Sequence, residues 1–321
     1  MSLVQALVSQ NAGAPLAWAE LPDVPLRPDD VRVEVHAVGV NPVDWKMREA
    51  SLLGLAQRVV GPGGPFVCGV DFSGVVGAVG SRVTGVAVGD RVVGGTDFSR
   101  RQRGSYARTV QVRADQVALL PPEVAFDAAA CLPVAGVTAR MALFELGHLL
   151  ERKAPRVLVL GASGGVGHFA VQLARAYGAR VAGVCSAKNA SLVARLGAEP
   201  IDYGAGDALE AAAAHGPFDV IIDGIGTATY PLGRCCKLLA PDGTHVLVMP
   251  KPRDYAHIAL PGRVRTVLGR PNRARLAPLV ADLAAGKIEV VIAERIPLAE
   301  AERAHTVSKA GRVVGKLVLV A

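Results

Sequence analysis

The sequence predicts an α/β protein with two parts, a β-rich part and a doubly wound parallel sheet. Three observations support this fold class. Short runs of alternating apolar and polar residues fill the first third of the chain, buried strands alternate with helices in the middle, and a glycine-rich turn joins one such strand to a helix. A length of 321 residues suits two domains. The chain is 51% hydrophobic and 20% charged, which allows a sizeable core and excludes a disordered protein.

The first third of the chain has the pattern of closely spaced strands. Residues 31–38 alternate apolar and polar side chains, as a half-buried strand does, and residues 105–112 alternate again. Residues 67–79 form an apolar run punctuated by glycines, and residues 90–94 follow a turn. Short strands joined by glycine turns predict a barrel-like or sandwich-like β domain.

The composition changes after Pro121-Pro122. Residues 126–150 are rich in Ala, Leu and Glu, which favours helix. Strands and helices then alternate, and this order predicts a parallel sheet with right-handed crossovers. The predicted strands are 156–160, 180–185, 219–223, 244–249 and a final strand 315–320, and the predicted helices are 165–177, 187–196 and 276–285. The final strand is able to return and pair with the first domain.

Several classes of protein are disfavoured by the composition. No apolar run reaches the roughly 18 residues that span a bilayer, and the N-terminus lacks the features of a secretory signal. We therefore expect a soluble cytoplasmic protein that does not bind a membrane. Five cysteines without regular spacing argue against disulfides and a metal site, and most are expected to be buried small residues. They are Cys68, Cys131, Cys185, Cys235 and Cys236.

The net charge of +7 is compatible with nucleic acid or with a phosphorylated small molecule as a partner. The densest group of arginines occupies positions 263, 265, 270, 273 and 275, and no aromatic residues interleave with it. This pattern favours a solvated face over a nucleic-acid patch, so we expect no nucleic-acid partner.

The glycine-rich turn has the pattern Ala162-x-Gly164-x-x-Gly167, directly after a strand and directly before a helix. Gly164 allows the backbone to approach a pyrophosphate, and Gly167 allows the helix to pack closely on the strand. The helix N-terminus adds N–H groups and a positive dipole end. Ala162 stands where the usual fingerprint has its first glycine, a departure that a small side chain can accommodate. We expect a dinucleotide site here rather than a purely structural turn, with contacts from Gly161, Ala162, Ser163, Gly164, Gly165, Val166 and Gly167.

The end of the second strand of this unit indicates which dinucleotide binds. NAD sites usually carry Asp or Glu there to hold the ribose 2′-hydroxyl. This chain has Cys185-Ser186-Ala187-Lys188-Asn189 and no acid. A hydroxyl donor and a cation suit a 2′-phosphate, which a carboxylate would repel. The alternative for Lys188 is an ordinary first-turn helix residue, although a cation is unfavourable at a helix N-terminus. We therefore expect NADPH, held by Ser186 and Lys188.

Several segments carry a resemblance along almost the whole chain. They are residues 38–46 (VGVNPVDWK), 69–76, 88–92, 132–139, the glycine-rich turn, 196–198 with 201–203, and Gly315-Lys316. With these segments the chain resembles the zinc-independent medium-chain dehydrogenases/reductases of the quinone oxidoreductase (zeta-crystallin-like) family. It is especially similar to the branch with chloroplast-envelope quinone oxidoreductase homologues and alkenal/enone reductases.

The resemblance implies a domain arrangement. Residues 1–122 and 272–321 would form a GroES-like β domain, and residues 123–271 a Rossmann domain that binds NADPH. It implies a cleft between the domains and a homodimer, commonly built by pairing cofactor-domain sheets edge to edge. Substrate contacts are expected from residues 45–60, 94–104 and 250–262.

The resemblance also implies roles for single residues. Tyr203 matches a tyrosine that joins the lysine around the 2′-phosphate. Thr138 and Asn41 match residues on the nicotinamide side, and Lys316, from the matching C-terminal segment, is expected among the cofactor-binding residues. Each of these assignments depends on the family match and not on the spacing alone.

The ligands of a zinc alcohol dehydrogenase are missing. Asn41 replaces the first cysteine ligand, Val70-Asp71 replaces a His-Glu pair, and the four-cysteine lobe is absent. Cys68 and His36 are two isolated ligand types, which do not make a site. We therefore expect no metal. Without a Lewis acid, hydride transfer from NADPH to a quinone or an α,β-unsaturated carbonyl is easier than oxidation of an alcohol.

Lys46 and Asn41 are the candidate catalytic residues. Lys46 would stabilise negative charge on the substrate oxygen or relay a proton, although it also fits an ordinary surface lysine. Asn41 would donate a hydrogen bond to the substrate or to the nicotinamide ribose. Asp44 is expected to cap or orient the local turn, and Trp45 to be core or cleft wall. The alternative to an enzyme is a non-catalytic NADPH-binding protein with a crystallin-like or RNA-binding role.

Overall fold

The computed structural model describes residues 3–49, 65–259 and 262–321, which divide into two compact units. Unit 1 comprises Met1–Val137, Arg270–Ala284 and Ile292–Ala321, and unit 2 comprises Thr138–Gly269 and Ala285–Val291. The sequence assigned residues 123–137 to the dinucleotide-binding domain. They belong to unit 1 because this helical run contacts the unit 1 sheet, where the hydroxyl of Ser73 donates to the carbonyl of Phe126 at 2.6 Å.

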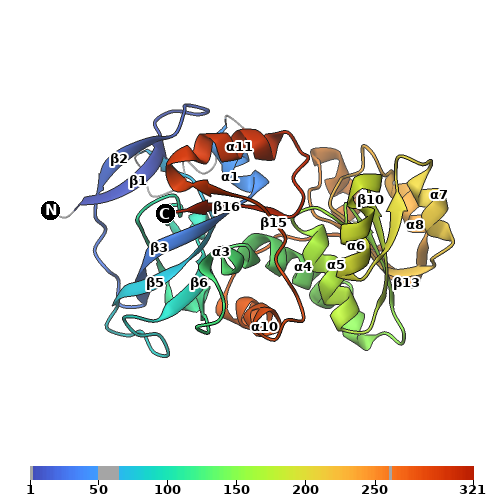
Figure 1. Cartoon of the computed structure of the whole chain (residues 1–321), viewed down its shortest axis with the longest axis horizontal. Helices are drawn as coiled ribbons and strands as arrows, with labels where there is room; N and C mark the ends of the chain where they lie inside the picture. The colour runs from blue at the N-terminus through green and yellow to red at the C-terminus, as the bar shows by residue number, and fades with distance from the viewer. Residues whose placement is uncertain (1–2, 50–64, 260–261) are drawn as a thin grey trace. The chain divides into compact units, whose positions relative to one another are not determined.

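Unit 1 is built on a sheet whose described strands follow the order β15-β16-β3-β5-β6-β8, with β7 also paired to β3 (Figure 1). A smaller sheet has the order β2-β1-β4. The strands are β1 (Leu3–Ser9), β2 (Ala17–Pro22), β3 (Asp30–Val40), β4 (Phe66–Val67), β5 (Asp71–Val79), β6 (Arg91–Gly95), β7 (Thr109–Arg113), β8 (Val117–Leu119), β15 (Ile292–Pro297) and β16 (Lys316–Val320). The helices and helical turns are α1 (Pro42–Arg48), η1 (Phe98–Arg100), η2 (Ala114–Gln116), α3 (Phe126–Ala129), η3 (Leu132–Gly136), α10 (Arg273–Ala284), η8 (Leu298–Glu300) and α11 (Ala301–Lys309).

The alternating pattern predicted the central strand of this sheet. In β3, Val31, Val33 and Val35 are buried, whereas Glu34 and His36 are exposed, so one face of the strand packs into the core. The final strand returns to the first domain as predicted, because β16 pairs antiparallel with β3. The strand predicted over 105–112 begins only at residue 109, since the backbone of residues 105–107 pairs irregularly with residues 7, 68 and 69.

Unit 2 contains a sheet of parallel strands in the order β11-β10-β9-β12-β13-β14. With β9 counted as the first strand, this is the Rossmann order 3-2-1-4-5-6. The strands are β9 (Arg156–Leu160), β10 (Arg180–Cys185), β11 (Glu199–Asp202), β12 (Phe218–Asp223), β13 (Leu239–Leu247) and β14 (Val264–Thr266). The helices and helical turns are α4 (Val137–Arg140), η4 (Met141–Leu146), η5 (Leu149–Glu151), α5 (Gly167–Ala176), η6 (Ala187–Asn189), α6 (Ala190–Leu196), α7 (Ala208–Ala213), α8 (Leu232–Lys237), η7 (Pro252–Asp254) and α9 (Tyr255–Ala259).

The predicted strands 156–160 and 180–185 match β9 and β10 residue for residue. Both are almost continuously apolar, and residues 157–160 are fully buried, as parallel strands covered on both faces should be. The helix predicted over 126–150 is instead interrupted by π-helical segments at η3 and η4. Pro133, near the start of η3, has no N–H to donate to a regular α-helical bond.

The sequence expectation that no run is long and apolar enough to span a membrane is corrected by the structure. Among the described residues, the helical run Phe126–Leu146 meets that length and composition, and 67% of its window is buried inside the protein. Charged residues interrupt the run, so it does not stand out as a continuous apolar stretch in the sequence. A mostly buried core helix of a globular protein passes the same criterion, so this observation is weak support for a membrane span.

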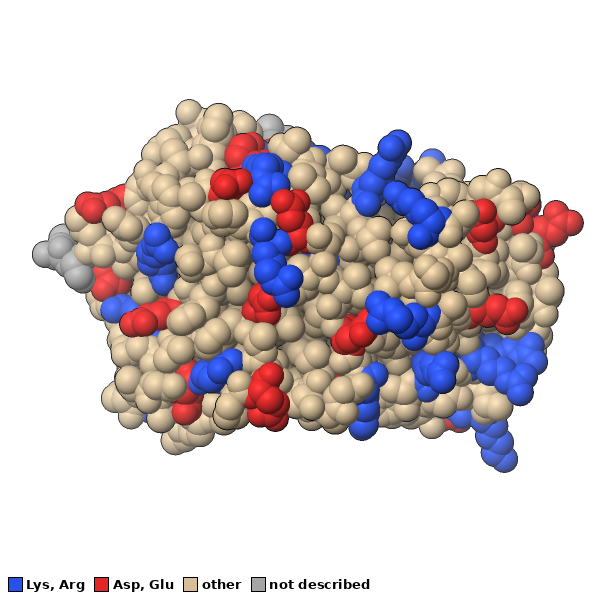
Figure 2. Space-filling view, viewed as in Figure 1, with Lys and Arg blue, Asp and Glu red and all other residues tan. Residues whose placement is uncertain are grey.

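Basic and acidic side chains intersperse on the face of the molecule in Figure 2, with basic groups gathering at the right of the view. Within unit 2, Arg263 and Arg265 donate to backbone carbonyls, including those of residues 240 and 262. Within unit 1, Arg273 donates to the carbonyls of residues 114 and 117. These arginines therefore take part in local structure, and the absence of a nucleic-acid partner stays a prediction.

Candidate functional site

The glycine-rich turn leaves β9 at Leu160 and enters α5 at Gly167. Gly161 has a φ of +86°, a left-handed conformation that residues with a side chain rarely adopt. The N–H groups of Gly161 and Ala162 both donate to the carbonyl of Val184 in β10, at 3.1 and 2.9 Å. The turn is thereby tied to the carboxyl ends of two neighbouring strands, the edge where dinucleotides bind in this type of sheet.

Gly167 leaves no room for a side chain. A Cβ built on Gly167 would lie 2.1 Å from the carbonyl oxygen of Gly161, whereas one on Gly164 would lie 3.3 Å from the same oxygen. Ala162 is fully buried, so its methyl group packs inside unit 2 and explains how an alanine is accommodated at the first fingerprint position. Among the described side chains, none caps the N-terminus of α5, which leaves a positive dipole end beside the turn.

The polar residues predicted around the 2′-phosphate follow β10 and β11. Cys185 and Asp202 are partners in the β10–β11 register, so Ser186 and Tyr203 stand next to each other at the ends of these strands. The N–H of Tyr203 also donates to the carbonyl of Cys185 at 3.1 Å. The hydroxyl of Ser186 is buried and has no hydrogen-bond partner among the described residues. Lys188 is exposed in η6, and 57% of Tyr203 is exposed.

A side-chain contact joins this region to the turn. The amide nitrogen of Asn189 donates to the hydroxyl of Ser163 at 3.0 Å. The segment with Ser186 and Lys188 is therefore held against the glycine-rich turn of the same unit. Thr138, which was predicted on the nicotinamide side, lies in α4 and is almost fully buried.

Unit 1 contains a buried polar cluster around Asn41, which precedes α1. The amide nitrogen of Asn41 donates to Oδ2 of Asp71 at 2.9 Å, and its Oδ1 accepts from Nζ of Lys316 at 2.5 Å. Lys316 also donates to the carbonyl of Val40 at 2.9 Å. Only 3% of Lys316 is exposed. The structure thus brings two predicted site residues, Asn41 and Lys316, together in unit 1.

Asp71 at the start of β5 organises this cluster. Its Oδ1 accepts from the N–H of Val134 at 3.0 Å, and its Oδ2 lies 3.9 Å from Nζ of Lys316. Burial raises the pKa of Asp71 to about 6, while Lys316 and the hydrogen bond from Asn41 pull it down. The carboxylate fixes the orientation of the Asn41 amide, so that the amide oxygen faces the ammonium group.

Lys46 lies on α1, where its ammonium group is 5.4 Å from the ring centroid of Trp45. The side chain is half-buried, and burial lowers its pKa. The indole N–H of Trp45 donates to the hydroxyl of Ser308 in α11 at 3.2 Å. A lysine with a lowered pKa releases its proton more readily near neutral pH than an exposed one.

Asp44 has the capping role that its position suggested. Its Oδ2 accepts from the backbone N–H of Asn41 at 2.8 Å. The structure adds two residues that the sequence did not single out, because the hydroxyl of Tyr106 lies 3.4 Å from the same carboxylate oxygen and 3.1 Å from Nε2 of His305. His305 is 199 positions from Tyr106 in the sequence, and no local sequence pattern predicts this contact.

The residue types that would hold a metal do not converge in the described ranges. Among residues 3–49, 65–259 and 262–321, no three His, Cys, Asp or Glu side chains are arranged to bind an ion. Cys68 is buried, and burial raises the pKa of its thiol. His36 stacks on Phe126, with 4.5 Å between the ring centroids.

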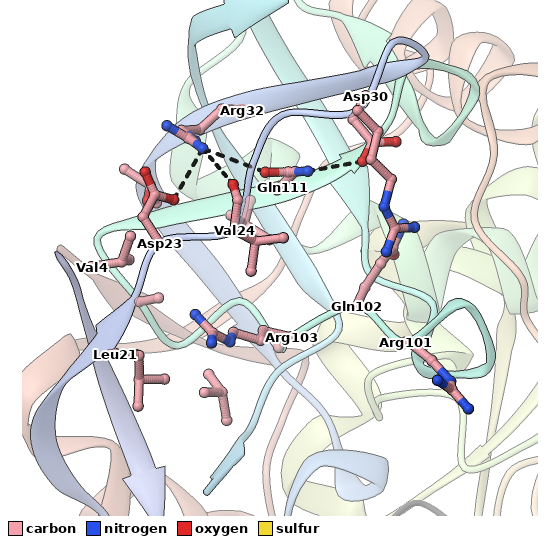
Figure 3. A pocket seen from close by; sticks show the side chains of 17 residues that line it. Val4, Leu21, Asp23, Val24, Asp30, Arg32, Arg101, Gln102, Arg103 and Gln111 are labelled. Atoms are coloured by element: carbon pink, nitrogen blue, oxygen red, sulfur yellow. Dashed lines mark hydrogen bonds and ion pairs between the residues drawn. The ribbon is translucent and has the colours of Figure 1, made fainter. Parts of the chain in front are cut away.

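A cavity of about 70 Å³ lies elsewhere in unit 1. It is lined in part by residues 101–104 of the expected substrate-contacting segment 94–104, but by none of the predicted catalytic or cofactor-binding residues. Figure 3 shows that one group of its polar side chains, around Arg32 and Gln111, is engaged in contacts within the cavity wall. Arg32 contacts Asp23 at 3.0 Å and the carbonyl of Val24 at 2.9 Å, and Gln111 donates to Asp30 at 2.9 Å. Of the expected substrate-contacting segments, residues 50–60 and 260–261 lie outside the described part of the chain.

Two family models match successive parts of the chain. The model described as alcohol dehydrogenase GroES-like domain matches residues 27–122, and the model described as zinc-binding dehydrogenase matches residues 196–319. Together with the parallel sheet of unit 2, these matches confirm the predicted fold class of a GroES-like β domain plus a Rossmann domain.

Relatives from several organisms match the chain. The chloroplast envelope quinone oxidoreductase homolog of Arabidopsis thaliana is 31% identical over 337 residues, covering 99% of this chain and 98% of that protein. The human mitochondrial NAD(P)H oxidoreductase RTN4IP1 is 37% identical over 213 residues, which are 63% of this chain and 53% of that protein. The chain thus spans about half the length of the mitochondrial relatives that it matches. A solved quinone oxidoreductase from Coxiella burnetii has a TM-score of 0.89 and 30% identity, with 100% of both chains covered.

The cytoplasmic location expected from the sequence is contradicted by these comparisons. The relatives include proteins whose names place them in mitochondria or chloroplasts. The expectation relied on the lack of a secretory signal, and that feature does not distinguish the cytoplasm from an organelle.

The family follows from the full-length match in Arabidopsis and from the agreement of the fold with the Coxiella structure. Relatives named quinone oxidoreductase, NAD(P)H oxidoreductase and trans-enoyl reductase agree in the general type of reaction. The chain belongs to the quinone oxidoreductase group of the medium-chain dehydrogenase/reductase family.

Proposed function

We propose that this protein transfers hydride from NADPH to a quinone or an α,β-unsaturated carbonyl compound without a metal ion. The observation that carries the proposal is the phosphate-binding turn of unit 2 together with the polar groups after β10 and β11. Relatives named quinone oxidoreductase and trans-enoyl reductase support this substrate class.

The preference for NADPH follows from the groups around the end of β10. The buried, unpartnered hydroxyl of Ser186 is a ready hydrogen-bond donor, and Lys188 supplies a cation nearby. Together with Gly161–Gly167 and Tyr203, these residues would hold the cofactor. A charged hydrogen bond to a phosphate oxygen adds about 1.5–3 kcal/mol. The 2′-phosphate of NADPH would therefore form bonds with Ser186 and Lys188 that the 2′-hydroxyl of NADH would lack.

The proposal of a metal-free reaction rests on the donor set of unit 1. One family model is described as zinc-binding dehydrogenase, and a zinc enzyme needs thiolate or imidazole ligands. Here Asn41 occupies the expected cysteine position, and its amide is already engaged by Asp71 and Lys316. The ammonium group of Lys316 lies beside Asn41 and would repel a zinc ion bound there. These residues therefore do not fit a catalytic zinc ion.

Bound NADPH would supply the hydride, and the residues of unit 1 would manage the negative charge that develops on the substrate oxygen. Lys46 has a cationic end group and a pKa lowered by burial, which suits stabilisation of an enolate followed by donation of a proton. Asn41, locked by Asp71 and Lys316, would act as an oriented polar group toward substrate or cofactor. Lys316 itself would contribute to cofactor binding through its fixed charge.

Steady-state oxidation of NADPH with a panel of quinones and enones tests the proposal. Wild-type protein should turn over at least one member, and Lys46→Met should lower kcat by about a hundredfold while the Kd for NADPH stays the same. Lys309→Met, which removes a lysine that also approaches the Trp45 ring, serves as the matched control. NADPH binding without turnover of any acceptor would instead favour a non-catalytic NADPH-binding role.

We also propose that the protein is a homodimer. In the described part of unit 2, β14 stands at one end of the sheet order, next to β13. An unpaired strand edge is available to pair with a second copy. Light scattering coupled to gel filtration would report the mass of two chains, and a mass of one chain at micromolar concentration would contradict the proposal.

A further inference from the structure

Asp223, His245 and Cys236 come together on one face of the unit 2 sheet. Asp223 ends β12, and His245 lies near the end of the neighbouring strand β13. The parallel register pairs Ile221 with His245, and Asp223 is two residues from Ile221, so both polar side chains project from the same face. Cys236 belongs to α8, which contacts β13 (Figure 1).

The two strand residues form a buried polar pair with unsatisfied atoms. Both side chains are fully buried, and Nε2 of His245 lies 3.7 Å from Oδ2 of Asp223, just beyond hydrogen-bond distance. Within the described residues, neither ring nitrogen of His245 nor Oδ2 of Asp223 has a hydrogen-bond partner. The other carboxylate oxygen accepts from the N–H groups of Ile225 and Gly226 at 2.8 and 2.7 Å, which fixes the orientation of Asp223. Buried polar atoms are normally paired, so this arrangement requires an explanation.

The neighbouring thiols Cys235 and Cys236 lie in contrasting environments. Cys235 is fully buried, its thiol donates to the carbonyl of Tyr230 at 3.8 Å, and burial raises its pKa to about 12. Cys236 is partly exposed on α8, which packs against β13, and its thiol helps to raise the pKa of the His245 imidazole. One thiol of the pair is therefore inert, and the other combines solvent access with a nearby base.

The charge state of His245 suits activation of this thiol. Burial lowers the pKa of the imidazole, but the Asp223 carboxylate and the Cys236 sulfur outweigh it, and the net pKa is raised. An imidazole beside a thiol is positioned to accept the thiol proton when the sulfur attacks an electrophile. Cys236, His245 and Asp223 would then act as nucleophile, base and orienting carboxylate, in the arrangement used by enzymes with an activated nucleophile.

We propose that Cys236 is a nucleophilic cysteine that is modified covalently by α,β-unsaturated carbonyl compounds, with His245 as its base and Asp223 as the residue that positions His245. The thiol proton passes to a ring nitrogen of His245, and the thiolate sulfur attacks the β-carbon of the electrophile. A C–S bond forms, the C=C π bond breaks, and its electron pair moves to give an enolate. The enolate then takes the proton back from the imidazolium at its α-carbon, so the thiol has added across the double bond.

The chemistry of the site selects this class of electrophile. A thiolate is a soft nucleophile and reacts readily with an activated double bond, and the addition requires neither an oxidant nor a metal. The reaction also requires no NADPH, so it is distinct from hydride transfer and is testable whether or not the protein reduces quinones. Modification of unit 2 by a reactive carbonyl compound would give the protein a second, covalent response to such molecules.

Reaction of the folded protein with N-ethylmaleimide, an activated-alkene probe, in the absence of NADPH tests the proposal. Intact mass should show one rapid addition, and peptide mapping should place it on Cys236 and not on Cys235. The rate should exceed that of the same cysteine in the urea-unfolded chain. Cys236→Ala should abolish the rapid addition, whereas the matched variant Cys235→Ala should retain it.

The roles of the base and of the positioning residue have their own variants. His245→Gln should slow the addition by about tenfold or more. Asp223→Asn keeps an oxygen that can accept the bonds from residues 225 and 226, removes the charge, and should also slow the addition. Circular dichroism establishes that each variant is folded. A Cys236 that reacts no faster than in the unfolded chain, or at an unchanged rate in the folded Asp223→Asn protein, overturns the proposal.

Discussion

The ammonium group of Lys316 donates a hydrogen bond to the side-chain oxygen of Asn41 at 2.5 Å, across 275 positions of sequence. Asp71 binds the nitrogen end of the same amide at 2.9 Å. The two charges therefore determine which end of the amide faces which neighbour, and the orientation of Asn41 is fixed before any ligand binds. Lys316 in β16, the last strand, thus completes a polar cluster whose first member, Asn41, directly follows β3.

Lys316→Met should destabilise the protein by about 3–5 kcal/mol, because it leaves the Asp71 carboxylate buried without its opposing charge. The free energy of unfolding from urea denaturation measures this loss. The exposed ion pair of Arg234 with Asp207 provides the comparison, and Arg234→Met should change the stability far less. Equal effects of the two substitutions would contradict a structural role of the buried charge.

The carboxyl group of Asp44 should make stability depend on pH. Burial raises its pKa from the ordinary 3.8 to about 7, so the folded state holds this proton more tightly than the unfolded state. Stability from this group should therefore fall as pH rises through that window, by about 1.4 kcal/mol per pH unit, and level off above it. Asp44→Asn should reduce this slope in urea denaturation between pH 5 and 8 and leave the part from Asp71, whose pKa burial raises to about 6. An identical slope in both proteins would show that Asp44 is not its source.

Gly164 and Gly167 of the turn should respond differently to substitution by alanine. Gly167→Ala places a Cβ 2.1 Å from the carbonyl oxygen of Gly161, so the turn must shift and binding of NADPH should be lost. Gly164→Ala places its Cβ at 3.3 Å, so the protein should stay folded with weaker binding. Fluorescence titration with NADPH and a thermal melt distinguish these results. Equal affinities in the two variants would contradict the packing argument.

Lys188→Ala should weaken NADPH binding by roughly ten- to a hundredfold and leave NADH binding nearly unchanged, since the lost contact is a charged hydrogen bond to the 2′-phosphate. Calorimetric titration with both cofactors measures the two affinities. Lys153→Ala, a change of another exposed lysine in unit 2, should affect neither. A similar loss for NADPH and NADH would remove Lys188 from the phosphate site.

The sequence predicted those elements whose structure is determined by residues close together in the chain. Residues 156–160 and 180–185 are nearly unbroken apolar runs, and they became β9 and β10 with the predicted bounds. The turn at 161–167 was recognisable because its glycines have a spacing that backbone packing requires. These features depend on neighbours in the chain, which explains why a sequence pattern was enough.

Contacts between distant segments were not predictable in the same way. Lys316 was expected in cofactor binding, but nothing in the sequence indicated its hydrogen bond to Asn41. The contact between Tyr106 and His305 and the interruption of the helix near Pro133 were missed for related reasons. The first depends on how α11 packs in unit 1, and the second on how a proline-containing helix adapts to its neighbours.

The proposal of metal-free hydride transfer from NADPH is tested most directly by isotope transfer. Chelator-treated protein would be incubated with an enone and NADPH in which both hydrogens at C4 of the nicotinamide ring are deuterium, and the product would be analysed by mass spectrometry. One deuterium should appear on the β-carbon of the reduced product, and added zinc should not increase the rate. A product without deuterium, or turnover only after zinc is restored, would contradict it.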